Sequence, residues 1–452
     1  MPQLVASPKP SRHFAVVTSL IETFGFSPLL ASTVVVFLAA LAVLAVVWVM
    51  RSAPPRTLVL ASGPAGSSFQ RWAVEYQKAL AAHGVTLQDQ PSAGSLDNLK
   101  RLQAASSPAD IGFVAGGATG GQKLVGLVSL GSIAYQPLMI FYRSAAPIPR
   151  LAELAGKQVA VGAAGSATRA LALQLLSANG ITGAPTVFSN LDAEAAATAL
   201  LDGKLDAVFL MGDSASTQTL RSLVRAPEVQ LFDFNQADAY VRRYPYLSKL
   251  ELPEGSFDLG KNLPSQDIEL VGTTVELVAR ADLNPALSDL LLEVAQEVHG
   301  RAGLFQKRGE FPAAQEHDFP LSEDALRYYK SGKGFFYRTI PSFWLASLAS
   351  RLLVVVVPLA LILIPALRML PVVYRMSIRL RILRCYRPLL RMERDLAGPL
   401  DPGQIKELHQ RLDEIGESVD HLKVPASFAD QFYDLRTHIV FVRQRLVAAE
   451  KK

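Results

Sequence analysis

Hydrophobic positions form three patterns along the chain. Two stretches are almost wholly apolar, 29–50 and 352–367, and the second lies between two arginines. Between them, from about 57 to 338, short apolar runs alternate with segments in which apolar residues recur every three or four positions. From 368 onwards the recurrence is helical throughout. The chain therefore predicts two membrane-length helices, an α/β domain between them and a helical C-terminal segment.

The first apolar stretch would be about 33 Å long as a helix, which is enough for the roughly 30 Å hydrocarbon core of a bilayer. A cleaved signal peptide usually has a shorter apolar region that ends in small residues, whereas this stretch ends at Trp48 and Met50. We therefore expect uncleaved transmembrane helices at 29–50 and 345–367. A cleaved signal peptide, for the first, and a buried soluble helix, for the second, stay open as alternatives.

Charge is distributed unevenly around these stretches. The whole chain has 45 basic and 40 acidic residues, but 339–394 carries nine arginines and one glutamate. By the positive-inside rule that side faces the cytoplasm, so we expect 1–28 and 368–452 in the cytoplasm and 57–338 outside a bacterial inner membrane. Because the excess of basic residues flanks a membrane segment, it indicates contact with anionic membrane lipid and not nucleic-acid binding.

The central domain repeats the order strand, loop, helix. We expect this order at four places: 58–62 into 69–82, 85–90 into a helix opened by Ser95, 158–162 into 166–178, and 205–211 into 213–224. The alternation predicts an α/β fold with a largely parallel sheet. Ser95 and Ser166 are the residues that we expect to cap their helices.

Two longer extended runs, 134–143 and 268–280, do not fit a strand–helix unit. We interpret them as paired crossings between two lobes. Lobe 1 would comprise about 57–143 and 268–338, and lobe 2 would comprise 144–267. A ligand cleft is expected between the lobes.

Three loops rich in glycine and serine, at 62–68, 92–95 and 162–168, each run from an expected strand into an expected helix. Glycine allows close approach of a ligand, and the first N–H groups of a helix lack internal partners, so such loops favour a carboxylate or phosphate. Arg169 would add positive charge. Ordinary turns and helix caps explain any one of these loops equally well.

Known catalytic and cofactor motifs are missing from the sequence. Residues 116–123 have the spacing of a phosphate-binding loop, but Gln122 stands where lysine is required. There is no HExxH or GxSxG motif, and the single Cys385 excludes an internal disulfide and a cysteine-based metal site. We expect no enzyme, no cofactor and no metal. A Ser/His/Asp set assembled by folding stays open.

Several ordered segments resemble the solute-binding subunits of TRAP transporters of the TAXI type, namely 57–69, 92–99, 154–168 and 201–209. Residues 322–335, which run into the second apolar stretch, are similar to the membrane-anchored branch of that family. The resemblance implies a class II periplasmic binding-protein fold that closes on a small organic anion, such as a dicarboxylate or an acidic amino acid. It also implies a TRAP-type permease as partner.

The same resemblance implies a set of ligand-binding positions on the three loops and after one strand of lobe 2. These are Gly63, Ser67, Ser68, Ser95, Gly165, Ser166, Thr168, Gly212 and Asp213.

The C-terminal segment has apolar residues at the a and d spacing of coiled coils, over 378–396, 405–422 and 432–446. We expect an Arg-rich helix followed by an antiparallel helical hairpin with its break at Pro425. A self-packed three-helix unit and a surface for self-association or a partner are both open. The second function class is accordingly a transmembrane receptor, in which closure of the outer domain acts on the cytoplasmic helices.

Overall fold

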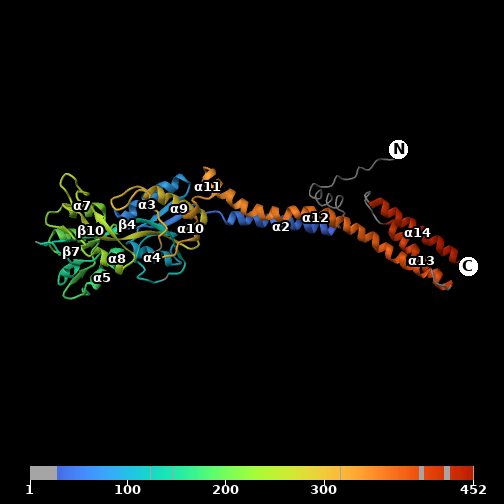
Figure 1. Cartoon of the computed structure of the whole chain (residues 1–452), viewed down its shortest axis with the longest axis horizontal. Coiled ribbons are helices and arrows are strands. Elements are labelled where there is room, and N and C mark those ends of the chain that lie inside the picture. Colours follow the sequence, from blue (N-terminus) through green and yellow to red (C-terminus); the bar gives the residue numbers. More distant parts are fainter. Residues whose placement is uncertain are drawn as a thin grey trace, which may run out of the picture. The chain divides into compact units, whose positions relative to one another are not determined.

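The computed structural model describes most of the chain, namely residues 28–122, 124–144, 146–315, 317–396, 402–421 and 428–450. These described residues fall into two compact units, one formed by 53–350 and the other by 28–52 with those of 351–450 (Figure 1). Nearly all of the expected cytoplasmic segment 1–28, and the expected break at Pro425, lie outside the described residues.

A mixed ten-stranded sheet forms the centre of the 53–350 unit. Its strands are β1 Thr57–Ala61, β2 Thr86–Gln90, β3 Ile111–Ala115, β4 Leu127–Tyr142, β5 Gln158–Ala160, β6 Val187–Ser189, β7 Ala207–Leu210, β8 Gln230–Leu231, β9 Leu247–Leu252 and β10 Ile268–Arg280. Their order is β2-β1-β3-β10-β4-β7-β5-β6, with β8 beside β4 and β9 beside β10. The β1–β2, β1–β3, β5–β6 and β5–β7 pairs are parallel, whereas β10 runs antiparallel to its neighbours.

The long strands β4 and β10 connect the two halves of this unit. They pair with each other from Leu127 opposite Arg280 to Leu138 opposite Val271. One part of β10 also pairs with β3, and the far end of β4 pairs with β7. The result is the predicted α/β fold with two lobes, like that of class II periplasmic binding proteins. The expectation of a largely parallel sheet is wrong, because the two crossing strands β4 and β10 run antiparallel to their neighbours.

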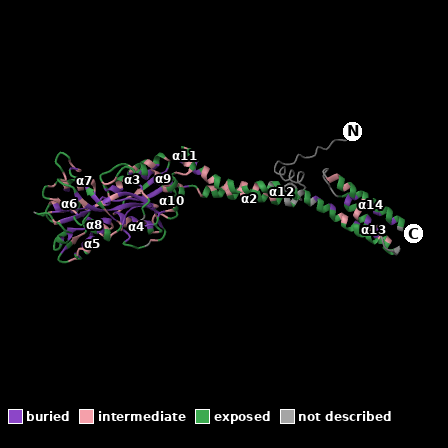
Figure 2. Ribbon diagram, in the orientation of Figure 1, coloured by how far each residue is buried: buried purple, intermediate pink, exposed green. Residues whose placement is uncertain are grey.

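Each lobe has its own hydrophobic core, which lies along the strands (Figure 2). The core of lobe 1 includes Leu58, Phe69, Phe113, Leu277 and Leu291. The core of lobe 2 includes Phe141, Val159, Leu175, Phe209 and Leu250. Burial of each such side chain contributes about 1.5–3 kcal/mol to stability, so these two clusters hold each lobe together independently of the loops between them.

Short helices connect the strands of the 53–350 unit. They are α3 Ser68–Ala82, α4 Ser95–Gln103, α5 Ala167–Ala178, α6 Ala193–Leu201, α7 Thr217–Arg225, α8 Ala237–Arg243, α9 Pro285–His299, α10 Glu323–Ser331 and α11 Phe335–Thr339, with a 3₁₀ helix at Leu151–Leu154. Serines cap several of them: Ser67 accepts a hydrogen bond from the N–H of Gln70, and Ser216 accepts one from Thr219.

The two expected caps have different outcomes. Ser166 caps α5, because its Oγ accepts a hydrogen bond from the N–H of Arg169 at 3.2 Å. The expectation for Ser95 is wrong. The cap of α4 is Gly94, whose φ of 120° lies in a region that favours glycine, so the helix already includes Ser95. The Ser95 hydroxyl accepts a hydrogen bond from the N–H of Ala115, at the end of β3, at 3.1 Å.

The other unit contains α2 Pro28–Arg51, most of α12 Phe343–Asp395, α13 Pro402–Asp420 and α14 Ala429–Glu450. Two stretches in α2 and α12, Ser32–Arg51 and Phe343–Ala366, are long and apolar enough to cross a membrane. Both are largely exposed (Figure 2). Arg351 Nη1 donates a hydrogen bond to the carbonyl oxygen of Val49 at 2.6 Å, so α12 supplies a donor to the last turn of α2.

The end of α12 packs with α13 and α14. Leu389, Leu412 and Leu435 are fully buried in a cluster shared by the three helices. Its other buried members are Ile378, Ile382, Met392, Leu408, Val419, Ile439, Val442 and Leu446. These are the a and d positions of the sequence pattern, so in this structure the pattern forms a shared three-helix core.

Candidate functional site

The three glycine- and serine-rich loops meet where lobe 1 contacts lobe 2. The N–H groups of Leu96 and Asp97 in lobe 1 donate hydrogen bonds to the carbonyl oxygen of Gly165 in lobe 2, at 3.1 and 3.2 Å. Ser68 in lobe 1 donates both its N–H and its hydroxyl to the carbonyl oxygen of Gly212, at 2.8 and 2.7 Å. The two lobes are therefore hydrogen-bonded to each other directly, in a closed arrangement.

Asp213 lies at the centre of this contact and is fully buried. Its Oδ2 accepts a hydrogen bond from the N–H of Ala167 at 2.8 Å. Its Oδ1 accepts hydrogen bonds from the hydroxyls of Thr168, at 2.8 Å, and Ser214, at 2.9 Å. The N–H of Ser95 in lobe 1 also donates to this carboxylate. The carboxylate thus occupies the N-terminal ends of α4 and α5, where backbone N–H groups stabilise negative charge.

Burial and hydrogen bonding have opposite effects on Asp213. Desolvation raises the pKa of the carboxyl, while the donors Ala167, Thr168, Ser214 and Ser95 lower it, and the net result is a raised pKa. The lobe contact thus holds an acidic group that the chain itself provides, at a desolvation cost that the four donors partly offset.

Little space remains around this carboxylate. A Cβ added to Gly94 would lie 2.9 Å from Asp213 Oδ2, and one added to Gly63 would lie 2.7 Å from Ser67 Oγ. The cavity beside Ala167 has a volume of about 10 Å³, roughly what a single water molecule needs. An external carboxylate would fit here only if the lobes separated and Asp213 moved away.

All nine predicted positions lie at or next to this contact, and we call them the loop cluster. They are Gly63, Ser67, Ser68, Ser95, Gly165, Ser166, Thr168, Gly212 and Asp213. Their polar atoms bond within the chain: Ser67 caps α3, and the Ser166 hydroxyl donates to the carbonyl oxygen of Ala163 at 2.8 Å. Arg169, which was expected to add charge, instead donates to the side chain of Asn190. Ligand binding by the cluster stays a prediction.

A larger cavity, of about 500 Å³, borders the loop cluster at Ser68 and Gly212. Lobe 1 contributes the start of α3, part of β4 and residues 298–306, and lobe 2 contributes α7 and residues 256–257. We call it the arginine cavity because three arginines line it. They are Arg71, Arg221 and Arg301.

The polar groups of this cavity are poorly satisfied. In the described part of the chain, none of the three arginines forms an ion pair. Ser256 Oγ and His299 Nε2 are buried without a hydrogen-bond partner among the described residues. None of these five residues was predicted as a site residue from the sequence, because they come from separate segments and form no motif. One weak indication was available, since Arg71 and Arg221 follow loops that end strands of the two lobes.

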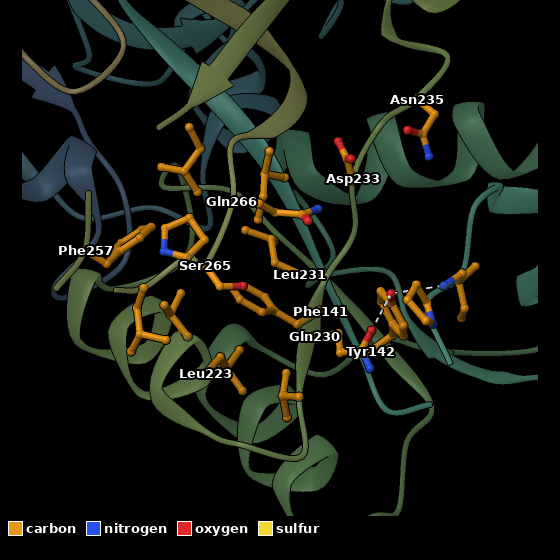
Figure 3. A pocket seen from close by; sticks show the side chains of 18 of the residues that line it. Phe141, Tyr142, Leu223, Gln230, Leu231, Asp233, Asn235, Phe257, Ser265 and Gln266 are labelled. Atoms are coloured by element: carbon orange, nitrogen blue, oxygen red, sulfur yellow. Dashed lines mark hydrogen bonds between the residues drawn. The ribbon is translucent and has the colours of Figure 1, made fainter. Parts of the chain in front are cut away.

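A third cavity lies within lobe 2 and also has a volume of about 500 Å³ (Figure 3). Phe141, Leu223 and Leu231 form apolar parts of its wall. The hydroxyl of Tyr142 donates to Gln230 at 3.0 Å, and Asp233 Oδ1 accepts from the N–H of Glu269 at 2.9 Å. Among the described residues that line it there is no lysine or arginine, so its chemistry does not match an anion.

Comparisons with solved structures find chains that share little sequence with this one. The periplasmic aliphatic sulphonate binding protein SsuA from Escherichia coli is 16% identical with a TM-score of 0.33, over 66% of this chain and 75% of that chain. An ancestral arginine-binding protein bound to arginine is 15% identical with a TM-score of 0.34, over 54% of this chain and 92% of that chain. A periplasmic binding protein from Brucella ovis with glutathione bound is 16% identical with a TM-score of 0.35, over 54% of this chain and 67% of that chain.

These proteins are solute-binding proteins by name, but at such low scores they give no information on the ligand of this chain. Among curated proteins, no sequence matches the chain. Residues 64–332, more than half of the chain and nearly all of its two lobes, match the NMT1-like family. The chain therefore belongs to the NMT1-like family.

Proposed function

We propose that the protein is a membrane-anchored, extracytoplasmic solute-binding protein that captures a small organic anion, such as a dicarboxylate or an acidic amino acid. It would deliver this solute to a TRAP-type permease, as the resemblance to TAXI-type subunits implies. Family membership supports a solute-binding role for the two lobes. The membrane anchors would be the apolar stretches of α2 and α12.

One observation carries the anionic character of the solute: helix ends from both lobes converge on a single negative charge. Asp213 supports this, because N–H groups and hydroxyls from α4, α5 and Ser214 all donate hydrogen bonds to its carboxylate and offset part of its desolvation. A solute carboxylate would take the place of Asp213 when the lobes separate. The closed arrangement would then be the solute-free state, held by the chain's own anion.

The proposed orientation rests on the arginines after the second apolar stretch, which by the positive-inside rule would place both termini in the cytoplasm. The two-lobed domain would then lie outside the inner membrane. The arginines would also lie close to anionic lipid headgroups. Accessibility of cysteines introduced at exposed positions of α6 and α14 to a membrane-impermeant maleimide would test this orientation, with labelling expected only at α6 in intact spheroplasts.

Equilibrium binding to the full chain in lipid nanodiscs tests the function directly. We expect saturable heat in calorimetric titrations with some members of a panel of dicarboxylates and acidic amino acids. Ser166→Tyr should abolish that binding, because a large ring would fill the loop cluster at the start of α5. A panel without any saturable binding, or binding that Ser166→Tyr leaves intact, would contradict the proposed site.

A second candidate, a transmembrane receptor, is favoured by the course of α12. This helix is unbroken from Phe343 to Asp395, through its membrane-length part and into the three-helix core. Its first residue, Phe343, is buried in the core of lobe 1, and the Arg56 guanidinium lies 5.3 Å from the ring centre of the next residue, Trp344. A movement of the lobes would therefore act directly on the start of a helix that reaches the C-terminal core.

Deletion of residues 397–452 separates the two functions. If the chain delivers solute, uptake by cells should survive the deletion at equal membrane abundance. If it signals, solute binding should stay normal while the downstream response is lost. The matched control is a chain of full length with Tyr433→Ala, a change on the exposed surface of α14 that should affect neither readout.

A further inference from the structure

We propose that the arginine cavity is a second binding site, separate from the loop cluster, for an organic anion that carries two or more negative charges on a flat apolar body. The cavity has a volume of about 500 Å³, which lies within the range of about 300–1,000 Å³ for small-molecule sites. Both lobes contribute to its walls, so its occupant would contact both.

Unbalanced positive charge is the first reason for an anionic occupant. Arg71 comes from the first turn of α3, Arg221 from α7 and Arg301 from the segment after α9. Within the described ranges these side chains are exposed and have no carboxylate partner. Planar guanidinium groups from three separate segments suit carboxylate, phosphate or sulfonate oxygens, because each can donate two parallel hydrogen bonds.

The nearby carboxylate of Glu310 is held by other partners. Glu310 is hydrogen-bonded to a residue of the wall, since its Oε1 accepts from the hydroxyl of Tyr135 at 2.9 Å. Its Oε2 accepts from the N–H of Lys307 at 2.6 Å. Both oxygens of this carboxylate are thus already engaged away from the three arginines.

Two buried polar atoms without partners are the second reason. Ser256 Oγ comes from lobe 2 and His299 Nε2 from the end of α9 in lobe 1, and both residues line the cavity. Such atoms normally have a hydrogen-bond partner in folded proteins. Both atoms are shielded from solvent in this closed arrangement, so oxygens of an occupant would become their partners once the Ser256 and His299 side chains turn toward the cavity.

Aromatic side chains are the third reason, and they indicate the body of the anion. Trp72, Tyr135, Phe257 and Phe305 line the same cavity. The ring of Trp72 is fixed edge-on against His299, with 4.9 Å between ring centres, and Tyr135 is fixed in the same way against Phe311. Rigid rings bind a flat apolar group at low entropic cost.

The site does not depend on release of Asp213. Its floor includes Ser68 and Gly212, whose hydrogen bonds hold the lobes closed, and the cavity is present in that closed arrangement. An occupant would therefore bind the closed form and stabilise it. This distinguishes the site from the loop cluster, where a solute must displace the chain's own carboxylate.

Phenyl phosphate is a suitable probe, because it joins a dianion to a flat ring. We expect the full chain in nanodiscs to bind it saturably in calorimetric titrations, to bind inorganic phosphate at least about tenfold more weakly, and to show no binding of phenol. Arg71→Gln, Arg221→Gln and Arg301→Gln should each weaken binding by roughly tenfold or more, since each removes charge-assisted hydrogen bonds. Binding should also weaken as salt is raised.

The control Arg242→Gln removes an exposed arginine of α8 that does not line the cavity, and it should leave affinity unchanged. Unaltered thermal unfolding of each variant would show that it is folded. Failure of the wild-type chain to bind the probe, or equal affinity in the three cavity variants and the control, would overturn the proposal.

The two proposals fail separately in this design. A dicarboxylate or amino acid that binds the wild type and the arginine variants, but not Ser166→Tyr, would support the loop cluster and overturn a role for the cavity in its binding. Phenyl phosphate binding that only the arginine variants weaken would support the cavity, whatever the loop cluster does.

Discussion

The loop cluster and the arginine cavity adjoin at Ser68 and Gly212, yet they differ in how their charges are balanced. In the loop cluster, one buried carboxylate receives hydrogen bonds from Ala167, Thr168, Ser214 and Ser95. In the cavity, the three arginines have no carboxylate partner in the part of the chain that the structure describes. The backbone donors of the loop cluster thus already have an acceptor within the chain, whereas the positive charge of the proposed second site would be balanced by an external anion.

The strongest test of this difference is removal of the internal anion. Asp213→Ala should lower the free energy of unfolding by about 3 kcal/mol, because buried N–H and hydroxyl donors at the lobe contact lose their acceptor. Added acetate should restore part of the loss by filling the vacated position. Thermal unfolding of the full chain in detergent, with and without acetate, measures both effects.

Asp238→Ala is the matched control for that variant. Asp238 is an exposed acidic residue of α8 that pairs with Lys249 at 3.1 Å, so its loss should change stability by less than about 0.5 kcal/mol. If Asp213→Ala were as stable as this control, the carboxylate would not hold the lobes together.

His299 offers a test on the side of the cavity. Burial lowers the pKa of its imidazole to about 3, and the rings of Trp72 and Tyr76 pack against it. Below the usual pKa of about 6.5, the unfolded chain binds a proton that the folded chain does not, so stability falls with falling pH. From pH 7 to pH 5 this group alone should lower the free energy of unfolding by about 2 kcal/mol.

The measurement is the difference in pH dependence between the wild type and His299→Phe, which keeps a ring in the same place but cannot titrate. The variant should lose less stability than the wild type over this interval. If the two pH profiles were parallel, the proton binding of the His299 imidazole would be the same in the folded and unfolded chain, which would contradict its burial without a partner. Bound phenyl phosphate should reduce the difference if it hydrogen-bonds to the imidazole.

The smallest expected change in stability concerns two serines, Ser68 of the loop cluster and Ser256 of the arginine cavity. Ser68→Ala removes hydroxyl contacts to Gly212 at 2.7 Å and Gln136 at 3.2 Å and should cost about 1 kcal/mol. Ser256→Ala removes a hydroxyl without a partner among the described residues and should change stability by less than about 0.5 kcal/mol. Denaturant titrations of the two variants side by side would show the difference, and equal losses would contradict it.

Much of the fold was predictable because it depends on local pattern. The alternation of apolar runs with helical segments predicts the α/β class, and the capping by Ser166 follows from residue type alone. The cap expected at Ser95 failed because the conformation of Gly94 moves the start of α4 by one residue. Where the helix begins depends on the backbone conformation of the turn before it, and a serine at position 95 does not determine that conformation.

The candidate site was predictable only in part. The sequence pointed to the loops, and the structure brings all nine positions together, but Asp213 lies 46 residues from Ala167, whose N–H it accepts. The packing of lobe 2 brings the Asp213 carboxylate to the start of α5, and the sequence does not show this packing. The cavity arginines were not predictable, since Arg71, Arg221 and Arg301 come together only through the tertiary fold.

The position of β10 between β3 and β4 also bears on the order in which the domain is synthesised and folded. The sheet of lobe 1 has a gap until residues 268–280 have been made, although β1, β2 and β3 precede them by more than 150 residues. Most of lobe 2, in contrast, is a continuous stretch that follows β4. Because chains fold as they emerge, lobe 2 should become structured first, and lobe 1 should then close around the returning strand.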